Sequence, residues 1–273
     1  MRHITVVHTL YYTDPVCPWS WAFEPSFRRL LWEFDGTLEV SFVMSGMRRD
    51  LEDPKNLALQ TLNASEQTGM PADVRLWLED PPDSSHPACT AVKAAAEQGV
   101  ADTYLRRLRE GFFCRRRKLD TAYALAAEAQ DVQGIDLERF RIDLRSHAIL
   151  EAFGADLERA QGVPAEHHAK GSDRIKLPSL EFRGADGEVH GVYGYTDYEA
   201  LREAALAAGA APANTIPPSI EQALKRFGTL ATTEVAAVCQ LAGPPVRAEL
   251  WRMAGEWRLK PEPVLTGELW RLA

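Results

Sequence analysis

One segment near the start of the chain places a cysteine where proteins make thiols reactive. The segment from Asp14 to Trp21 reads DPVCPWSW and lies between a β-branched, aromatic stretch and an apolar helical pattern. A cysteine just before the first helical turn lies beside free backbone N–H groups and the positive end of the helix dipole, which favour a thiolate. Pro18 suits that turn because it has no N–H to lose. The segment predicts a reactive Cys17 with a depressed pKa, and a buried structural cysteine is the alternative.

The other three cysteines form no redox or metal motif. Cys89, Cys114 and Cys239 are irregularly spaced, and no pair forms Cys-x-x-Cys. We therefore expect neither a disulfide framework nor a zinc site. Cys89 is a weak candidate for a second active-site thiol and a stronger one for a small core residue. Cys114 precedes the basic run 115–118, which either lowers its pKa or forms a solvated corner, and Cys239 fits a core position.

The sequence around Cys17 predicts a β-α-β unit. Residues 4–12 and 38–44 are rich in β-branched and aromatic side chains and predict two strands. Between them, an apolar stripe from Trp19 to about Phe34 predicts one helix. Strands joined in this way run parallel with a right-handed crossover.

The middle of the chain predicts a helical subdomain followed by a hairpin. Residues 45–65 are polar and irregular, whereas residues 87–165 carry helical apolar stripes almost throughout. Strand signals return on both sides of a Gly-rich turn within residues 176–192 and predict a β-hairpin. Thr196 and Asp197 then cap a further helix.

These features together resemble the DsbA family of thioredoxin-fold proteins. The resemblance rests on the first strand, the Cys-Pro-Trp-x helix start, the helical insertion and a Leu-Pro before the hairpin, and it covers about residues 3–210. It points to the cytoplasmic branch with FrnE-like proteins and YjbH-like Spx adaptors. Kappa-class glutathione transferases and 2-hydroxychromene-2-carboxylate isomerases are similar at greater distance. The resemblance implies an α/β thioredoxin-like fold with an all-helical insertion at about residues 55–170, Cys17 as the nucleophile and Pro178 as a cis-proline facing it.

One departure from the family pattern bears on function. Ser20 stands where a redox pair has its second cysteine, so no second thiol can release a mixed disulfide by internal attack; the Ser20 hydroxyl could instead donate a hydrogen bond to a Cys17 thiolate. We expect first a monothiol thiol-disulfide oxidoreductase that acts on a protein or small-molecule disulfide or thiol. The alternatives are a glutathione-dependent transferase or isomerase, and a non-catalytic adaptor that holds a peptide in the groove.

Residues beside Cys17 are candidates for binding. Asp14 either tunes the thiol or fixes the turn through an Asx hydrogen bond. Pro18 and Trp19 lie next to the sulfur in the sequence. Of Trp19 and Trp21, we expect one to pack in the core and the other to form a wall of the groove.

The resemblance adds binding residues from later in the chain. Leu177, before the cis-proline, would offer backbone hydrogen bonds to a bound peptide or glutathione. The helix start at Thr196 and Asp197 would bind the γ-glutamyl end of glutathione, or is a plain N-cap. We expect no permanently bound cofactor, with glutathione as the one candidate ligand, and no metal.

Charge and composition limit the partners. The net charge of −8 over 273 residues argues against a protein that coats nucleic acid or an anionic membrane. No apolar run approaches the roughly 20 residues of a membrane helix. The first residues lack the features of a signal peptide, so we expect a cytoplasmic protein.

The C-terminal residues predict a second, small domain. Small residues and prolines at 208–218 separate residues 1–210 from residues 219–273, with 211–218 as the linker. Three helices and two short strands predicted in the last part resemble a winged helix-turn-helix. Its almost neutral charge disfavours DNA binding. We therefore expect a module that docks a protein partner or dimerises.

Overall fold

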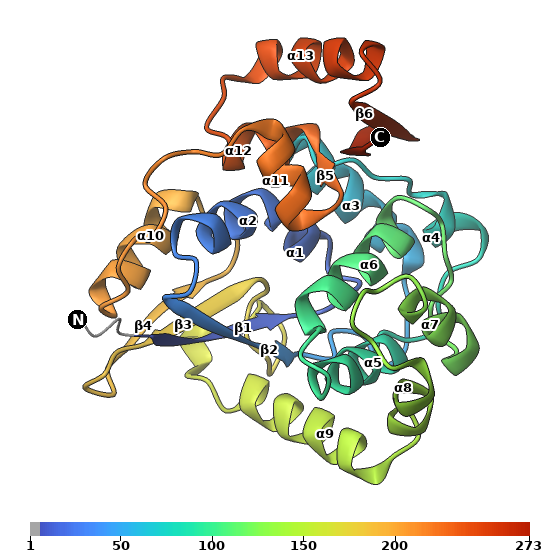
Figure 1. Ribbon diagram of the computed structural model, residues 1–273. Coiled ribbons are helices and arrows are strands. Elements are labelled where there is room, and N and C mark those ends of the chain that lie inside the picture. The colour runs from blue at the N-terminus through green and yellow to red at the C-terminus, as the bar shows by residue number, and fades with distance from the viewer. Residues whose placement is uncertain (1–5) are drawn as a thin grey trace.

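The computed structural model describes residues 6–273, and a four-stranded mixed sheet lies at its centre (Figure 1). The strand order is β2-β1-β3-β4; β1 pairs in parallel with β2 and antiparallel with β3, which pairs antiparallel with β4. The predicted β-α-β unit and hairpin are confirmed, although residues 4 and 5 of the first predicted strand lie outside the described residues. The strands are β1 (Val7–Thr13), β2 (Leu38–Met44), β3 (Ser179–Arg183) and β4 (Val189–Tyr193).

Two helices, rather than the single predicted one, connect β1 to β2. They are α1 (Pro18–Ala22) and α2 (Glu24–Glu33), and Phe23 lies between them. Pro25 is in the first turn of α2. A proline inside a continuous helix would remove a hydrogen bond and clash with the preceding turn. The chain therefore ends one helix and starts another just before this proline.

The predicted helical subdomain lies between β2 and β3. Its side chains form the largest hydrophobic core of the chain, which includes Trp77, Tyr104 and Phe112. The helices are α3 (Pro54–Thr68), α4 (Arg75–Glu79), α5 (His86–Ala96), α6 (Ala101–Phe113), α7 (Ala122–Ala129), α8 (Leu137–Asp143), α9 (His147–Gln161) and the 3-10 turn η1 (Ala165–His167).

The expectation of irregular structure at residues 45–65 is wrong from residue 54 onward. The Asp53 side chain accepts a hydrogen bond from Asn56 N at 3.0 Å, and Pro54 occupies the first turn of α3. Gly69 ends the helix in the left-handed conformation, with φ of 72°. The sequence therefore contains the signals that start and end this helix. The apolar stripe between them is weak, and for this reason the helix was not predicted.

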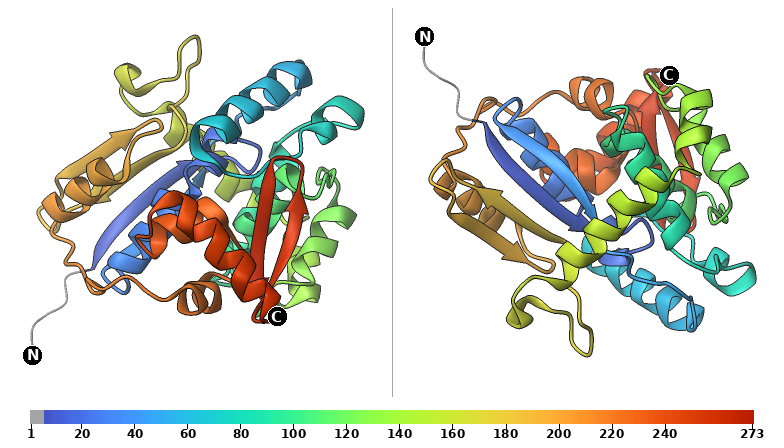
Figure 2. Two further views of the ribbon diagram at one scale, coloured as in Figure 1. Left: turned by 90° about the horizontal axis from the view of Figure 1, so that it is seen from above. Right: turned by 90° about the horizontal axis from the view of Figure 1, so that it is seen from below.

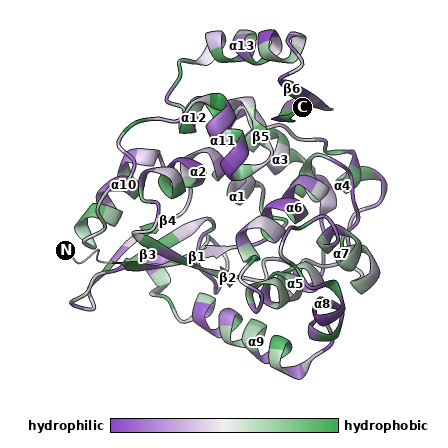
Figure 3. Ribbon diagram, in the orientation of Figure 1, coloured by the Kyte–Doolittle hydropathy of each residue, from purple (hydrophilic) through white to green (hydrophobic). Residues whose placement is uncertain are grey.

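Helices cover both faces of the sheet. Helices α2 and α10 (Tyr198–Ala207) pack on one face, and α9 crosses the other face near β2 (Figures 1 and 2). Hydrophobic and hydrophilic residues alternate along α2 and α10 (Figure 3), and the buried apolar ones join the sheet in one core. The first turn of α1 is thereby held at the end of β1, where the chain presents Cys17. No helix within residues 6–273 is long and apolar enough to cross a membrane.

The C-terminal residues form three helices and a three-stranded sheet with strand order β5-β7-β6. The predicted helices and the hairpin of β6 and β7 are present, and the two-residue strand β5 was not predicted. We call residues 219–273 the C-terminal module. Its elements are α11 (Ile220–Phe227), β5 (Leu230–Ala231), α12 (Thr232–Val238), α13 (Gly243–Gly255), β6 (Leu259–Val264) and β7 (Gly267–Leu272).

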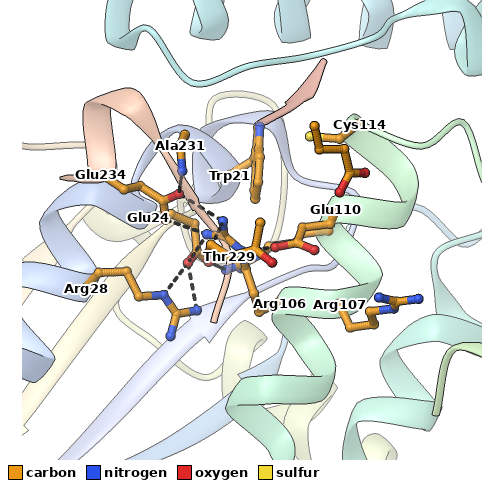
Figure 4. A network of polar contacts seen from close by, with 12 residues as sticks. Trp21, Glu24, Arg28, Arg106, Arg107, Glu110, Cys114, Thr229, Ala231 and Glu234 are labelled. Atoms are coloured by element: carbon orange, nitrogen blue, oxygen red, sulfur yellow. Dashed lines mark hydrogen bonds and ion pairs between the residues drawn. The ribbon is translucent and has the colours of Figure 1, made fainter. Parts of the chain in front are cut away.

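A buried network of charges joins the C-terminal module to the rest of the chain (Figure 4). Arg106 of α6 forms ion pairs with Glu24 of α2 and Glu234 of α12. Glu24 also pairs with Arg28 and Arg109, and all five side chains are buried. Burial opposes the ionisation of Glu24, but the three arginines outweigh it and lower its pKa to about 2.

Candidate functional site

Cys17 lies where the sequence places it, at the start of the helix that follows β1. It is the N-cap of α1, and its Sγ accepts a hydrogen bond from Ser20 N at 3.4 Å. Pro18 occupies the first turn, as predicted. The cysteine side chain is only 3% exposed. The helix N-terminus therefore faces the sulfur, but water scarcely reaches it.

Burial raises the pKa of the Cys17 thiol above its ordinary value. Hydrogen bonding from Ser20 and the charge of Arg109 oppose this rise, whereas the negative charge of Asp14 adds to it. Loss of solvation is the largest of these effects, since removing water costs a charged thiolate more solvation free energy than a neutral thiol. This direction is opposite to the depressed pKa that the sequence predicted.

Ser20 is fully buried beside Cys17. Its hydroxyl has no hydrogen-bond partner within residues 6–273, so the expected bond from this hydroxyl to the sulfur is not formed with regular geometry. The side chain is still close enough to favour the thiolate. The contact that is clearly formed comes from the backbone N–H of Ser20, which any residue at this position would supply.

A small cavity of about 180 Å³ opens beside the sulfur. Cys17, Pro18, Trp19 and Leu177 line it, so the structure brings these four predicted residues together. The peptide bond between Leu177 and Pro178 is cis, as the sequence predicted. The wall also includes residues that were not predicted from the sequence: Ser45, Met47, Gln60, Ala169, Ser172, Arg174 and Ile175.

The two tryptophans divide as expected between the core and the groove. Trp21 is buried and donates from Nε1 to the carbonyl of Pro71 at 2.8 Å. Trp19 lines the cavity and packs against Tyr195, with ring centroids 5.3 Å apart. Tyr195 was not predicted as a neighbour of the site. Its position just before the N-cap of α10 is a signal in the sequence that could have identified it.

Asp14 is a buried carboxylate that does not line the cavity at Cys17. Its side chain is fully buried and accepts hydrogen bonds from Val16 N at 2.9 Å, Met47 N at 2.6 Å and Ser85 Oγ at 3.0 Å. The Asx turn, which was the alternative, is confirmed. Cys89 Sγ is a fourth donor at 3.4 Å. Asp14 therefore fixes the loops around Cys17 rather than reaching a ligand.

Thr196 and Asp197 do not line the cavity at Cys17. The Asp197 side chain accepts a hydrogen bond from Ala200 N at 3.0 Å and caps α10. This is the plain N-cap that was the alternative to a glutathione site. The structure gives these two residues no second feature that points to a ligand.

The remaining cysteines are buried and free. Cys89 belongs to the core of the helical subdomain and Cys239 to the core of the C-terminal module, as expected. Burial raises the pKa of Cys114 well above its ordinary value, which disfavours a reactive thiol there. In the basic run beside it, Arg115 pairs with Glu110 and with Glu262 at 2.8 Å, whereas Arg116 and Arg117 are exposed. No cluster of potential metal ligands occurs within the part of the chain that the structure describes.

The family model for thioredoxin matches residues 10–168, and the chain belongs to this family. The resemblance to DsbA-type and YjbH-like proteins is borne out by the relatives and solved structures to which the chain is similar. The ClpXP adapter protein SpxH of Halalkalibacterium halodurans is 28% identical over 95% of this chain and 87% of its own length. The SpxH adapter of Bacillus subtilis is 24% identical over the same shares of the two chains.

Solved structures share the fold. A proposed protein disulfide isomerase from Nitrosomonas europaea matches with a TM-score of 0.63 and 21% identity over 74% of this chain and 97% of its own. The cytosolic disulfide reductase DsbM from Pseudomonas aeruginosa matches with a TM-score of 0.54 and 18% identity over 68% of this chain and 88% of its own. The α/β thioredoxin-like fold is therefore confirmed.

Proposed function

We propose that this chain is a protein-binding adaptor that presents a client to a ClpXP-type protease, and that Cys17 is not its catalytic centre. The observation that carries this proposal is the state of Cys17. The thiol is 3% exposed, burial raises its pKa, and Ser20 replaces the thiol that would resolve a mixed disulfide. A thiol-disulfide enzyme needs an accessible thiolate and a route to release its product.

The relatives support this proposal over the whole chain. The SpxH adapters align with about 95% of it, which includes the C-terminal module as well as the thioredoxin-like part. An adaptor must hold two proteins at once, so it needs two binding surfaces. We assign the groove beside Leu177 and Trp19 to a client segment and the C-terminal module to a second partner. We also place the protein in the cytoplasm, in keeping with its four free cysteines.

A monothiol oxidoreductase remains the second candidate, because one observation favours it. Cys17 lines a cavity together with Leu177, which precedes the cis-proline, and this is where a disulfide or glutathione would bind. The function requires an opening motion that exposes the sulfur and lowers its pKa. Glutathione itself would then be the external thiol that resolves the mixed disulfide.

The test is degradation by the cognate ClpXP in a lysate of cells that lack this chain. Proteins are quantified by mass spectrometry with and without added purified chain. We expect at least one protein to be degraded several-fold faster when the chain is present and ATP is supplied. An unchanged degradation profile, together with glutathione-dependent disulfide reduction that Cys17→Ser abolishes, would replace the adaptor with the oxidoreductase.

A further inference from the structure

Two cavities larger than the one that Cys17 lines lie in the helical subdomain. One of about 930 Å³ lies between α7 and α8, and one of about 470 Å³ lies between α5, α7 and α9. They share Ala122 and Leu144 as wall residues and therefore adjoin, and we call the two together the trough. Helices α7, α8 and α9 lie close together in the folded chain (Figure 1).

The trough is apolar and open. Its rim carries Tyr123, Ile142 and Leu150, which are 88%, 70% and 51% exposed. Large apolar side chains with that much exposure are typical of binding surfaces. A pocket for a small molecule encloses most of its ligand, whereas these walls stand open to solvent. An open apolar trough between helices is the shape that receives an amphipathic helix.

Several small residues are among those that line the trough, and one of them weakens the helix in which it lies. Gly154 lies in the middle of α9 and lines the trough, and a Cβ atom built there meets nothing within 4 Å. A glycine at such a position costs about 1 kcal/mol relative to alanine. On α7, Ala122 and Ala126 line the trough (Figure 3 shows α7 as mostly hydrophobic). Small side chains on both sides leave room for a partner backbone to approach.

The charge at the rim selects the partner. Arg141 forms an ion pair with Glu138 at 2.6 Å, which neutralises both. Arg145 lines the trough, is exposed, and its guanidinium has no hydrogen bond or ion pair with any residue from 6 to 273. The rim therefore carries one free positive charge on a chain whose net charge is −8. A carboxylate on the partner would pair with it.

We propose that this trough binds an amphipathic helix of a protein partner, with its apolar side chains toward Ala122 and Gly154 and a carboxylate toward Arg145. The site is separate from the groove at Cys17. It requires no thiol chemistry and holds whether or not the chain acts with ClpXP. The partner's binding face has apolar residues at spacings of three and four, with acidic residues at its edge.

The test uses a phage-displayed library of amphipathic helical peptides of about 18 residues, long enough to form a helix in the bound state. Peptides enriched on the wild-type chain are synthesised, and their affinity is measured by fluorescence anisotropy. Gly154→Gln fills the trough while favouring the helix, and Arg145→Glu reverses the charge at the rim. The matched controls are Gly255→Gln, another helical glycine with open space around it, and Lys260→Glu, an exposed lysine of β6.

We expect the enriched peptides to be acidic and apolar on one face. Gly154→Gln and Arg145→Glu should each weaken binding at least tenfold, with both controls unchanged. Enriched peptides that bind Gly154→Gln as tightly as wild type, or no enrichment at all, would overturn the proposal. A concentration-dependent dimer that Gly154→Gln abolishes in analytical ultracentrifugation would also overturn it, because the occupant would then be a second copy of this chain.

Discussion

Arg106 of α6 and Glu234 of α12 form a buried ion pair that ties the C-terminal module to the helical subdomain. Arg106 Nη2 donates to Glu234 Oε2 at 2.9 Å and to the carbonyl of Thr229 at 3.1 Å. Glu234 in turn accepts a hydrogen bond from Ala231 N at 2.6 Å. Because the pair is closed off from water, neither residue can exchange its partner for solvent. The pair fixes α12 against α6.

Glu234→Ala should lower the free energy of unfolding by about 3–5 kcal/mol, because it leaves Arg106 buried without this partner. Urea denaturation of the full chain measures the loss. The matched control is Glu221→Ala, which removes an exposed carboxylate that pairs with Arg258 at 2.9 Å and should change stability little. Equal losses for the two variants would contradict the structural role assigned to the buried pair.

The network around Glu24 predicts sensitivity to acid. The pKa of Glu24 falls from an ordinary value of 4.5 to about 2 in the folded chain. A lowered pKa contributes stability that is complete above pH 4.5 and is lost as pH falls toward 2. The contribution is about 3 kcal/mol.

Glu24→Gln should therefore be less stable than wild type at neutral pH and show a flatter loss of stability in this acid range. Urea denaturation at a series of pH values measures it. The control is Glu249→Gln, at an exposed carboxylate that pairs with Arg252 at 2.6 Å. It should show the same dependence of unfolding free energy on pH as wild type. A Glu24→Gln curve that runs parallel to wild type would show that Glu24 does not supply the acid dependence.

Ser20→Cys tests whether the missing second thiol limits thiol chemistry. It restores a Cys-x-x-Cys pair in which the new thiol lies beside Cys17 Sγ and can attack a mixed disulfide from within. Because Cys17 stays buried with a raised pKa, we expect Ser20→Cys, Ser20→Ala and wild type all to stay at background in the reduction of insulin disulfides by dithiothreitol. Activity of Ser20→Cys well above wild type would mean that the missing second thiol, and not the burial of Cys17, blocks turnover.

Gly46 separates the cavity at Cys17 from the trough in the helical subdomain. Its φ is +57°, and an added Cβ would lie 2.5 Å from Leu157 and 3.0 Å from His86 Nε2. Its neighbours Ser45 and Met47 line the cavity at Cys17. Gly46→Ala must therefore both adopt an unfavourable backbone conformation and displace packed side chains.

We expect Gly46→Ala to destabilise the chain by about 3 kcal/mol, from backbone strain and overpacking together. The control is Gly36→Ala, where φ is +72° but nothing lies within 4 Å of the new atom. In that variant only the backbone strain should lower the free energy of unfolding, by about 1–2 kcal/mol. Thermal unfolding of both variants checks this difference, and identical melting temperatures would contradict it.

Local sequence predicted the elements of the site better than its chemistry. The strand, the helix start at Cys17 and the cis bond before Pro178 depend on residues that are adjacent in the chain. The burial of Cys17 depends on tertiary packing, and Gln60 of α3 and Arg174 of the segment before β3 come from distant parts of the sequence to line the cavity beside it. The sequence predicts the helix start whose dipole favours the Cys17 thiolate. It does not predict the loss of solvation, which has the larger effect on the pKa.

The same limit applies to Asp14 and to the C-terminal module. Nothing in the sequence near Asp14 shows that Met47 and Ser85 will donate hydrogen bonds to its carboxylate oxygens. The hairpin of the C-terminal module follows from a local pattern, but its attachment through Glu234 to Arg106 joins residues more than a hundred positions apart. Such pairs become visible only when the chain has folded.

Replacing Cys17 with alanine in the ClpXP degradation assay tests the central claim most directly. If the groove only binds, a change from a buried thiol to a methyl group leaves the client site in place, and Cys17→Ala should accelerate degradation of the same proteins as wild type. Circular dichroism confirms that the variant is folded. Loss of the acceleration in a folded Cys17→Ala variant would contradict the account and make the thiol itself the working group.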